Sequence, residues 1–232
     1  MANLTYEQVA KTIDHSLLRP ELDLDFVRNG VELARRYGVA SATVRPADVA
    51  FAVDLLEGSD VFVSTVVGFP HGSSSTETKA FEAERAVELG AREIDMVLNI
   101  GRLRSGRAVE VRDDIAAVVA VAQAKGAIVK VIFENCYLDE VRKIRLCQIC
   151  GDVSADWVKT STGYAPSGAT MDDLKLMRKH APPHVQVKAA GGIRDLDTLL
   201  AVRELGVSRC GASRTKEMLD ETKRRLEKSA TS

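Results

Sequence analysis

The chain has 232 residues, of which 45% are hydrophobic, and it carries 32 basic and 33 acidic residues. This length and apolar content support a full core in one domain spanning residues 1–232, with no linker or low-complexity stretch. The balanced charge argues against a nucleic-acid-binding protein, which needs a basic face. The densest basic stretch, Lys216 to Lys228, is interrupted by acidic residues and is interpreted as a solvated helix face.

The sequence shows no membrane-spanning segment. The apolar run from Ile115 to Ala122 falls far short of the roughly 20 residues that a spanning helix needs. The first residues lack the basic start and apolar core of a signal peptide, so we expect a cytoplasmic protein. Cys147 and Cys150 have metal or redox spacing, but neither a second pair nor a nearby histidine accompanies them. We interpret these cysteines as reduced residues packed on a helix.

A short β-rich run, a loop and a helical segment of ten or more residues recur along the chain. A short helix over Thr5–Lys11 is predicted before the first run. The predicted strands are Thr12–Asp14, Ala40–Val44, Val61–Val67, Glu93–Val97, Ile128–Phe133, Trp157–Thr160, Val185–Ala189 and Arg209–Gly211.

The ends of several helices are also marked in the sequence. Ser74-Ser75-Thr76-Glu77 fits a capping box, and Gly90 is placed to end the helix that it begins. Thr170-Met171-Asp172-Asp173 is typical of a helix start, and Pro182-Pro183 ends that helix. Gly206 closes the helix that follows Asp195.

Strands that alternate with helices imply parallel pairing with right-handed crossovers. Eight such units fit a closed (β/α)₈ TIM barrel, which usually takes about 250 residues. An open Rossmann-type sheet is the alternative, but no Gly-x-Gly-x-x-Gly sequence follows an early strand. We therefore expect an α/β, single-domain TIM barrel with a short extra N-terminal helix.

Two lysines, Lys159 and Lys188, lie at or near the ends of consecutive predicted strands. Because side chains alternate along a strand, valines that pack under the helices leave both amines pointing inward. Asp95 and Asp14 are expected to point inward by the same reasoning. A buried ammonium is costly, so two of them at the active-site end of a barrel indicate a chemical purpose.

Lysine attacks a carbonyl only as the neutral amine, which is scarce at an ordinary pKa of about 10.4. A second ammonium about 5 Å away, at an effective dielectric of about 20, repels it by roughly 3 kcal/mol. This repulsion lowers the pKa by a little over two and makes one amine nucleophilic. The alternative is that one lysine only pairs with Asp95 or lies at the barrel rim.

Glycines and hydroxyls follow the last three predicted strands, in Ser161-Thr162-Gly163, Gly191-Gly192 and Gly211-Ala212-Ser213. Backbone amides of such loops can close on an anion, so we expect a phosphate site there. A metal site is not expected, because the histidines are scattered and form no ligand cluster. These histidines are His15, His71, His180 and His184. We expect His15 and His71 to form hydrogen bonds or to cap helices.

Several motifs, in their order, closely resemble those of the deoxyribose-phosphate aldolase family from about residue 12 to about residue 215. They are Ile13 to Leu18, Thr65 to Pro70, Glu93 to Gly101, Val158 to Gly163 and Lys188 to Gly192. The resemblance implies a class I aldolase without metal or cofactor, which cleaves 2-deoxy-D-ribose 5-phosphate reversibly to D-glyceraldehyde 3-phosphate and acetaldehyde. It also implies a homo-oligomer, a dimer or higher.

The resemblance further implies a role for each matched residue. Lys159 forms the Schiff base, Lys188 lowers the pKa of its neighbour and transfers protons, and Asp95 moves protons with water. The residues expected to bind the substrate or its phosphate are Thr160, Thr162, Gly163, Gly191, Gly192, Gly211, Ser213 and Arg214.

Three positions depart from the family pattern. Ser213 is followed by Arg214 where many members have two serines, and Thr43 stands where many have a cysteine. The chain ends Lys228 to Ser232, where some members end in a tyrosine near the active site.

Two alternatives remain open: another Schiff-base barrel aldolase with a different sugar or sugar phosphate, and a non-catalytic sugar-phosphate-binding barrel. The second has no need of two buried amines.

Overall fold

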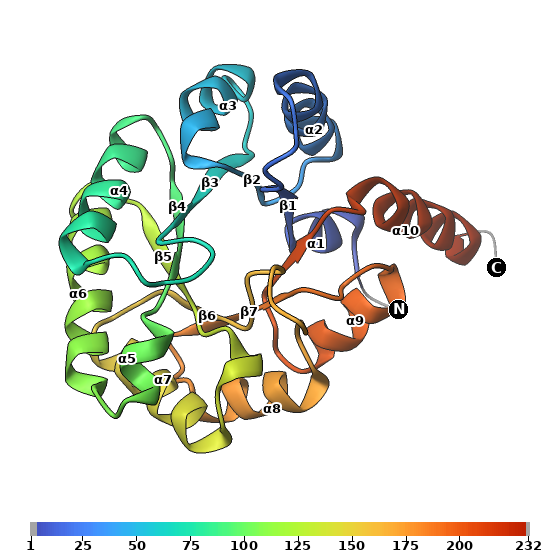
Figure 1. Ribbon diagram of the computed structural model, residues 1–232. Helices are drawn as coiled ribbons and strands as arrows, with labels where there is room; N and C mark the ends of the chain where they lie inside the picture. The colour runs from blue at the N-terminus through green and yellow to red at the C-terminus, as the bar shows by residue number, and fades with distance from the viewer. Residues whose placement is uncertain (1–3, 231–232) are drawn as a thin grey trace.

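The computed structural model describes residues 4–230 and shows eight parallel strands in one closed barrel, arranged in sequence order (Figure 1). β1 pairs with β8 and closes the barrel. The strands are β1 Ile13–Leu17, β2 Ser41–Val44, β3 Phe62–Val67, β4 Glu93–Val97, β5 Ile128–Ile132, β6 Trp157–Lys159, β7 Gln186–Ala190 and β8 Arg209–Ala212. The expected TIM barrel is confirmed.

Helices surround the barrel and connect successive strands (Figure 1). They are α1 Tyr6–Ala10, α2 Leu24–Tyr37, α3 Val49–Leu55, α4 Thr76–Glu88, α5 Ile100–Arg104, α6 Ala108–Ala124, α7 Glu140–Asp152, α8 Met171–His180, α9 Leu196–Glu204 and α10 Thr215–Ala230, with 3₁₀ turns at Pro46–Asp48 and Asn135–Tyr137. The expectation of ten or more residues in each crossover helix is wrong for α3, with seven residues, and α9, with nine.

The extra N-terminal helix α1 is confirmed and begins with a capping box. The Thr5 side chain accepts a hydrogen bond from the Gln8 N–H, and the Gln8 side chain accepts one from the Thr5 N–H. At α4, by contrast, the cap is Ser75, which accepts from the Thr78 N–H. The helix start was therefore predicted within one residue, but the reciprocal box lies at α1.

Two strand boundaries differ from the prediction in ways that matter for the site. β1 extends beyond Asp14 to Leu17, because its last residues continue the ladder with β2. β7 runs from Gln186 to Ala190, one residue later at each end than predicted, so Lys188 is its central residue. Lys188 lies opposite Lys159 in the β6–β7 register, and both amines reach the same Asp95 oxygen.

The barrel separates apolar and charged side chains onto its two faces. Outward-facing Ile94, Val158 and Val187 are fully buried beneath the helices. The alternate positions point into the barrel and carry charged groups, including Asp95 and Lys159. Strand alternation, together with helices that cover the outer face, therefore creates a polar interior.

The remaining expectations about the whole chain concern cysteines, membranes and termini. Cys147 and Cys150 are buried on α7, and burial raises the pKa of Cys147 to about 12, so the packing interpretation is confirmed. No helix within residues 4–230 has the length and apolarity of a membrane span. The expectations about the first residues and the C-terminal end fall partly on residues 1–3 and 231–232, outside the described range.

Candidate active site

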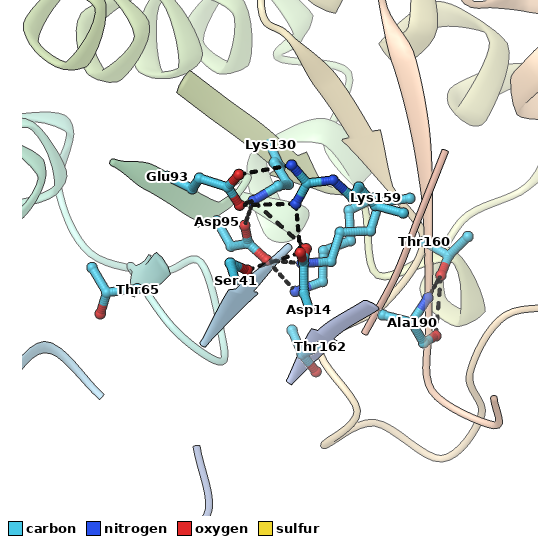
Figure 2. Close-up of polar contacts among 12 residues, drawn as sticks. Asp14, Ser41, Thr65, Glu93, Asp95, Lys130, Lys159, Thr160, Thr162 and Ala190 are labelled. Carbon is cyan, nitrogen blue, oxygen red and sulfur yellow. Dashed lines mark hydrogen bonds and ion pairs between the residues drawn. The ribbon is translucent and has the colours of Figure 1, made fainter. Parts of the chain in front are cut away.

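Lys159, Lys188 and Asp95 meet inside the barrel, as their strand positions predict. The Nζ atoms of Lys159 and Lys188 donate hydrogen bonds to the same Asp95 oxygen, Oδ2, at 2.6 Å and 2.8 Å. Figure 2 shows Asp95 on β4 and Lys159 on β6 pointing toward one another. The exposed fractions are 4% for Lys159, 1% for Lys188 and 0% for Asp95, so all three are withdrawn from bulk water.

Further charged side chains surround this group. Lys188 Nζ lies 2.5 Å from Asp14 Oδ2. Lys130 Nζ lies 2.5 Å from Glu93 Oε2 and 2.9 Å from Asp95 Oδ1, contacts that are drawn in Figure 2. Arg209 completes the arrangement through ion pairs with Asp14 at 2.6 Å and Glu93 at 2.9 Å. We call this set the interior charge cluster: Asp14, Glu93, Asp95, Lys130, Lys159, Lys188 and Arg209.

The cluster has one base more than it has acids. It holds three carboxylates and four bases, so full protonation of the bases leaves one positive charge in a buried volume. Lys188 and Lys130 each contact at least two carboxylates, whereas within residues 4–230 Lys159 forms an ion pair with Asp95 alone. Lys159 is therefore the base that loses its proton at the lowest cost.

The pKa values of the cluster follow this imbalance. Burial lowers the pKa of Lys159 to about 8, and repulsion from the other two lysines adds to the effect, while Asp95 opposes it. Burial alone would also lower the pKa of Lys130, but its carboxylate neighbours outweigh burial and raise it above the ordinary value. Burial would raise the pKa of Asp95, but the three surrounding ammonium groups hold it well below its usual range.

Three members of the cluster, Glu93, Lys130 and Arg209, were missed by the sequence reasoning. The same alternation that identified Asp95 could have found Lys130, which lies between the buried Val129 and Val131 on β5. Glu93 shares its strand face with Asp95. Arg209 is harder to predict, because it begins its strand and such a position often lies at the surface.

The loops expected to bind phosphate lie together beyond β6 and β7. Gly163, Gly191 and Gly192 have positive φ angles of 88°, 78° and 94°, a conformation that favours glycine. The Ala169 N–H donates to the carbonyl of Gly191 at 3.0 Å and ties the two loops to each other. These contacts bring the backbone of both loops to the same end of the barrel.

Gly211 lies within β8 rather than in the loop that follows it. A Cβ atom at this position would lie 3.7 Å from Lys188 Cε and 3.4 Å from Ala190 Cβ. The missing side chain therefore leaves space beside Lys188.

Thr160 and Thr162 are expected to bind the substrate or its phosphate, and in this structure both of their hydroxyl groups have protein partners. Thr160 Oγ1 donates to the Ala190 carbonyl and accepts from the Ala190 N–H, both at 3.1 Å. The Thr162 hydroxyl donates to the carboxylate of Glu134. Sequence shows that a hydroxyl is present but not which nearby backbone or carboxylate group will bind it.

Ser213 and Arg214 are exposed between β8 and α10. The Arg214 carbonyl accepts from the Met218 N–H, which places Arg214 at the start of α10. Arg194, exposed just after Gly191-Gly192, was not anticipated. Within residues 4–230 neither guanidinium has an ion-pair partner, so both are available to an anion.

Two further residues bear on the sequence expectations. Thr43 lies on β2, and its buried hydroxyl has no hydrogen-bond partner in the described part of the chain. His15 is buried and shares a 2.8 Å hydrogen bond with Thr215, as expected for a bonding rather than a metal-binding histidine. Across residues 4–230, no group of three or more His, Cys, Asp or Glu side chains is arranged to hold a metal ion.

A buried amine with a lowered pKa, a second amine and a shared carboxylate, at the active-site end of a TIM barrel, define a Schiff-base-forming enzyme. Residues 11–212 match the family described as DeoC/LacD family aldolase. The chain belongs to this family.

Individual relatives carry a more specific name. The chain is 52% identical to the deoxyribose-phosphate aldolase of Rhodopirellula baltica over 97% of its own length and 94% of that protein. It is 48% identical to the deoxyribose-phosphate aldolase of Geobacillus sp. over 88% of its length and 92% of that protein. The tetrameric deoxyribose phosphate aldolase of Aeropyrum pernix has a similar structure, with a TM-score of 0.87, 32% identity and coverage of 94% and 92%.

The pKa of Lys159 predicts how imine formation depends on pH. Because only the neutral amine attacks, the rate at which a small aldehyde is trapped on Lys159 by cyanoborohydride should rise with pH, with a midpoint near 8. Lys188→Met removes a cation that disfavours protonated Lys159, so the midpoint should move upward. Lys188→Arg keeps the cation and should leave it near the wild-type value. A midpoint that stays fixed or falls in Lys188→Met would contradict this electrostatic assignment.

Proposed function

We propose that Lys159 is the Schiff-base lysine of a class I aldolase that reversibly cleaves 2-deoxy-D-ribose 5-phosphate to D-glyceraldehyde 3-phosphate and acetaldehyde. The observation that carries this assignment is the lowered pKa of the Lys159 amine, about 8, inside the interior charge cluster. At pH 7 about one such amine in ten is neutral, compared with about one in a few thousand at the ordinary pKa. The cluster therefore raises the population of the nucleophile by more than about a hundredfold.

Cleavage of the C2–C3 bond requires an electron sink, and the iminium ion formed from the Lys159 amine provides it. The Lys159 nitrogen attacks C1 of the open-chain sugar, and loss of water from the carbinolamine gives an iminium ion. Removal of the proton from the C3 hydroxyl breaks the C2–C3 bond, and the electron pair moves into the iminium to form an enamine. D-Glyceraldehyde 3-phosphate leaves first. Protonation of the enamine at C2 and hydrolysis then release acetaldehyde and restore the amine.

The neighbours of Lys159 supply the proton movements and the electrostatics. Asp95 Oδ2 lies within hydrogen-bond distance of both amines, so it can accept a proton from one and pass it, directly or through water, to the substrate oxygen. Lys188, which is ion-paired with Asp14 and Asp95, places a positive charge beside Lys159 and lowers the pKa of that amine. That charge disfavours protonation of Lys159 before the reaction.

The phosphate of the substrate fits the loops that follow β6, β7 and β8. Gly163, Gly191 and Gly192 supply backbone amides, and the N-terminus of α10 adds donors and a favourable dipole beside Ser213. The guanidinium of Arg214 can add charge-assisted hydrogen bonds. In this proposal no metal ion or organic cofactor takes part.

We also infer an assembly and a cellular location, which relatives and composition support. One relative of similar structure is a tetramer, which supports a homo-oligomer here. A phosphorylated sugar and small aldehydes as ligands, together with the composition of the chain, support a cytoplasmic enzyme that binds neither nucleic acid nor membranes.

Covalent trapping tests the role of Lys159. Reduction by borohydride in the presence of acetaldehyde should add an ethyl group to Lys159, because the imine carbon becomes an amine-bound methylene. Peptide mass spectrometry should locate this adduct, find none in Lys159→Ala, and give the same result after thorough chelation. An unmodified chain, or an adduct confined to Lys188, would refute the assignment.

If Arg214 binds the phosphate, its loss should weaken the binding of the phosphorylated sugar but not of the free sugar. Arg214→Ala should raise KM for 2-deoxy-D-ribose 5-phosphate by about ten-fold or more, since charge-assisted hydrogen bonds contribute roughly 1.5–3 kcal/mol. The kcat/KM for free 2-deoxy-D-ribose should change little. Arg36→Ala, at an exposed position in the last turn of α2, is the matched control. Equal losses with both sugars would contradict phosphate binding by Arg214.

A further inference from the structure

Glu134 is a buried carboxylate outside the interior charge cluster. It follows β5 at the active-site end of the barrel and is 2% exposed. Its backbone is left-handed, with φ 54° and ψ 63°, a conformation that few residues other than glycine, asparagine and aspartate adopt. No ion pair joins Glu134 to a cation within residues 4–230. A buried charge and a strained backbone at one residue are costly, and such costs concentrate at functional sites.

The carboxylate of Glu134 binds the segment that follows Lys159. Its two oxygens accept from the Thr162 N–H at 3.2 Å and 3.3 Å, and one of them also accepts from the Thr162 hydroxyl. Thr162 Oγ1 in turn accepts from the Tyr164 N–H at 3.0 Å. The carboxylate thus holds Thr162, and the Thr162 hydroxyl in turn holds Tyr164 on the other side of Gly163.

The residues on either side of Glu134 hold the same segment through the backbone. The Phe133 N–H donates to the Lys159 carbonyl at 2.9 Å, and the Asn135 N–H donates to the Thr160 carbonyl at 3.0 Å. These two bonds extend the β5–β6 pairing beyond the strands. Glu134 lies between these two residues, and its left-handed backbone directs the side chain toward Thr162.

Beyond Thr162 the segment reaches a loop from another part of the barrel. The ring of Tyr164 packs edge-to-face on Phe69, in the loop after β3, with centroids 5.3 Å apart. The position of residues 160–164 therefore depends on Glu134 on one side and on this aromatic contact on the other.

A neutral amide would replace this contact only in part. The Thr162 hydroxyl and N–H are both donors, and an ionised carboxylate presents acceptors to both without adding a donor of its own. In Glu134→Gln an amide nitrogen replaces one acceptor oxygen, so a single oxygen remains to accept from the two Thr162 donors, and the charge that strengthens these hydrogen bonds is lost. A carboxylate, with two acceptor oxygens and charge-assisted hydrogen bonds, therefore suits the two Thr162 donors better than an amide of the same length.

We propose that Glu134 is a positioning residue that holds residues 160–164 in the conformation that receives the phosphate end of the substrate. This inference rests on the proposed function of the same site. The Lys159 amine has its own contact with Asp95 at 2.6 Å, so it does not depend on Glu134. Loss of the carboxylate should therefore weaken substrate binding and leave the covalent step largely intact.

Kinetics with the phosphorylated and the free sugar test whether Glu134 acts on substrate binding rather than on the covalent step. In Glu134→Gln, KM for 2-deoxy-D-ribose 5-phosphate should rise by about ten-fold or more, with kcat within about three-fold of wild type. The kcat/KM for free 2-deoxy-D-ribose and the borohydride trapping of acetaldehyde on Lys159 should stay within about two-fold. Glu140→Gln makes the same chemical change at an exposed position on α7 and should alter none of these values.

Thr162→Val removes the hydroxyl partner of Glu134 and should also raise KM for the phosphorylated sugar while leaving kcat/KM for the free sugar nearly unchanged. This second variant keeps the proposal testable if Glu134→Gln does not fold. Hydrogen exchange provides a readout that needs no turnover: the amides of Thr162 and Tyr164 should exchange faster in Glu134→Gln than in wild type or Glu140→Gln. Unchanged exchange, wild-type kinetics, or equal losses with both sugars would overturn the proposal. Wild-type protein that fails to cleave the phosphorylated sugar would refute the proposed function instead, and exchange would then decide the role of Glu134.

Discussion

The structure of the active site depends on one electrostatic constraint, the excess of one base over the acids in the interior charge cluster. Three carboxylates and four bases share a buried volume in which an unbalanced charge is costly. Loss of one proton removes the imbalance. Lys159 loses it because in the described part of the chain it has a single carboxylate partner, whereas Lys188 and Lys130 have at least two each. A nucleophilic amine is therefore a property of the whole cluster rather than of the lysine pair alone.

The barrel makes this constraint possible. Strand alternation directs valine and isoleucine toward the helices and charged side chains toward the barrel axis, so that residues from β1, β4, β5, β6, β7 and β8 meet in one place. Arg209 and Glu93 form the deeper part of the cluster and hold Asp14 and Lys130. The reactive groups Lys159 and Asp95 then lie nearer the loops that are proposed to bind phosphate.

The fold and the central residues could be predicted from the sequence, because both follow from periodicity. The positions of Lys159 and Asp95 required only the two-residue repeat of a strand. Lys130, between the buried Val129 and Val131, obeys the same rule and was overlooked. The partners of Thr160 and Thr162 could not be predicted, since they come from residues about 30 positions away in sequence. Glu134 carries no sequence pattern that reveals its left-handed backbone.

The most direct test of the central claim is the pKa of Lys159 in the free enzyme. NMR of protein labelled at lysine Cε and Nζ, with Lys159→Met for assignment, follows each amine as pH is raised. The balance of charge in the interior cluster predicts that the Lys159 amine titrates near 8. A Lys159 amine that stays protonated to about pH 10, close to the ordinary lysine pKa, would show that the cluster tolerates its extra charge and would contradict the claim.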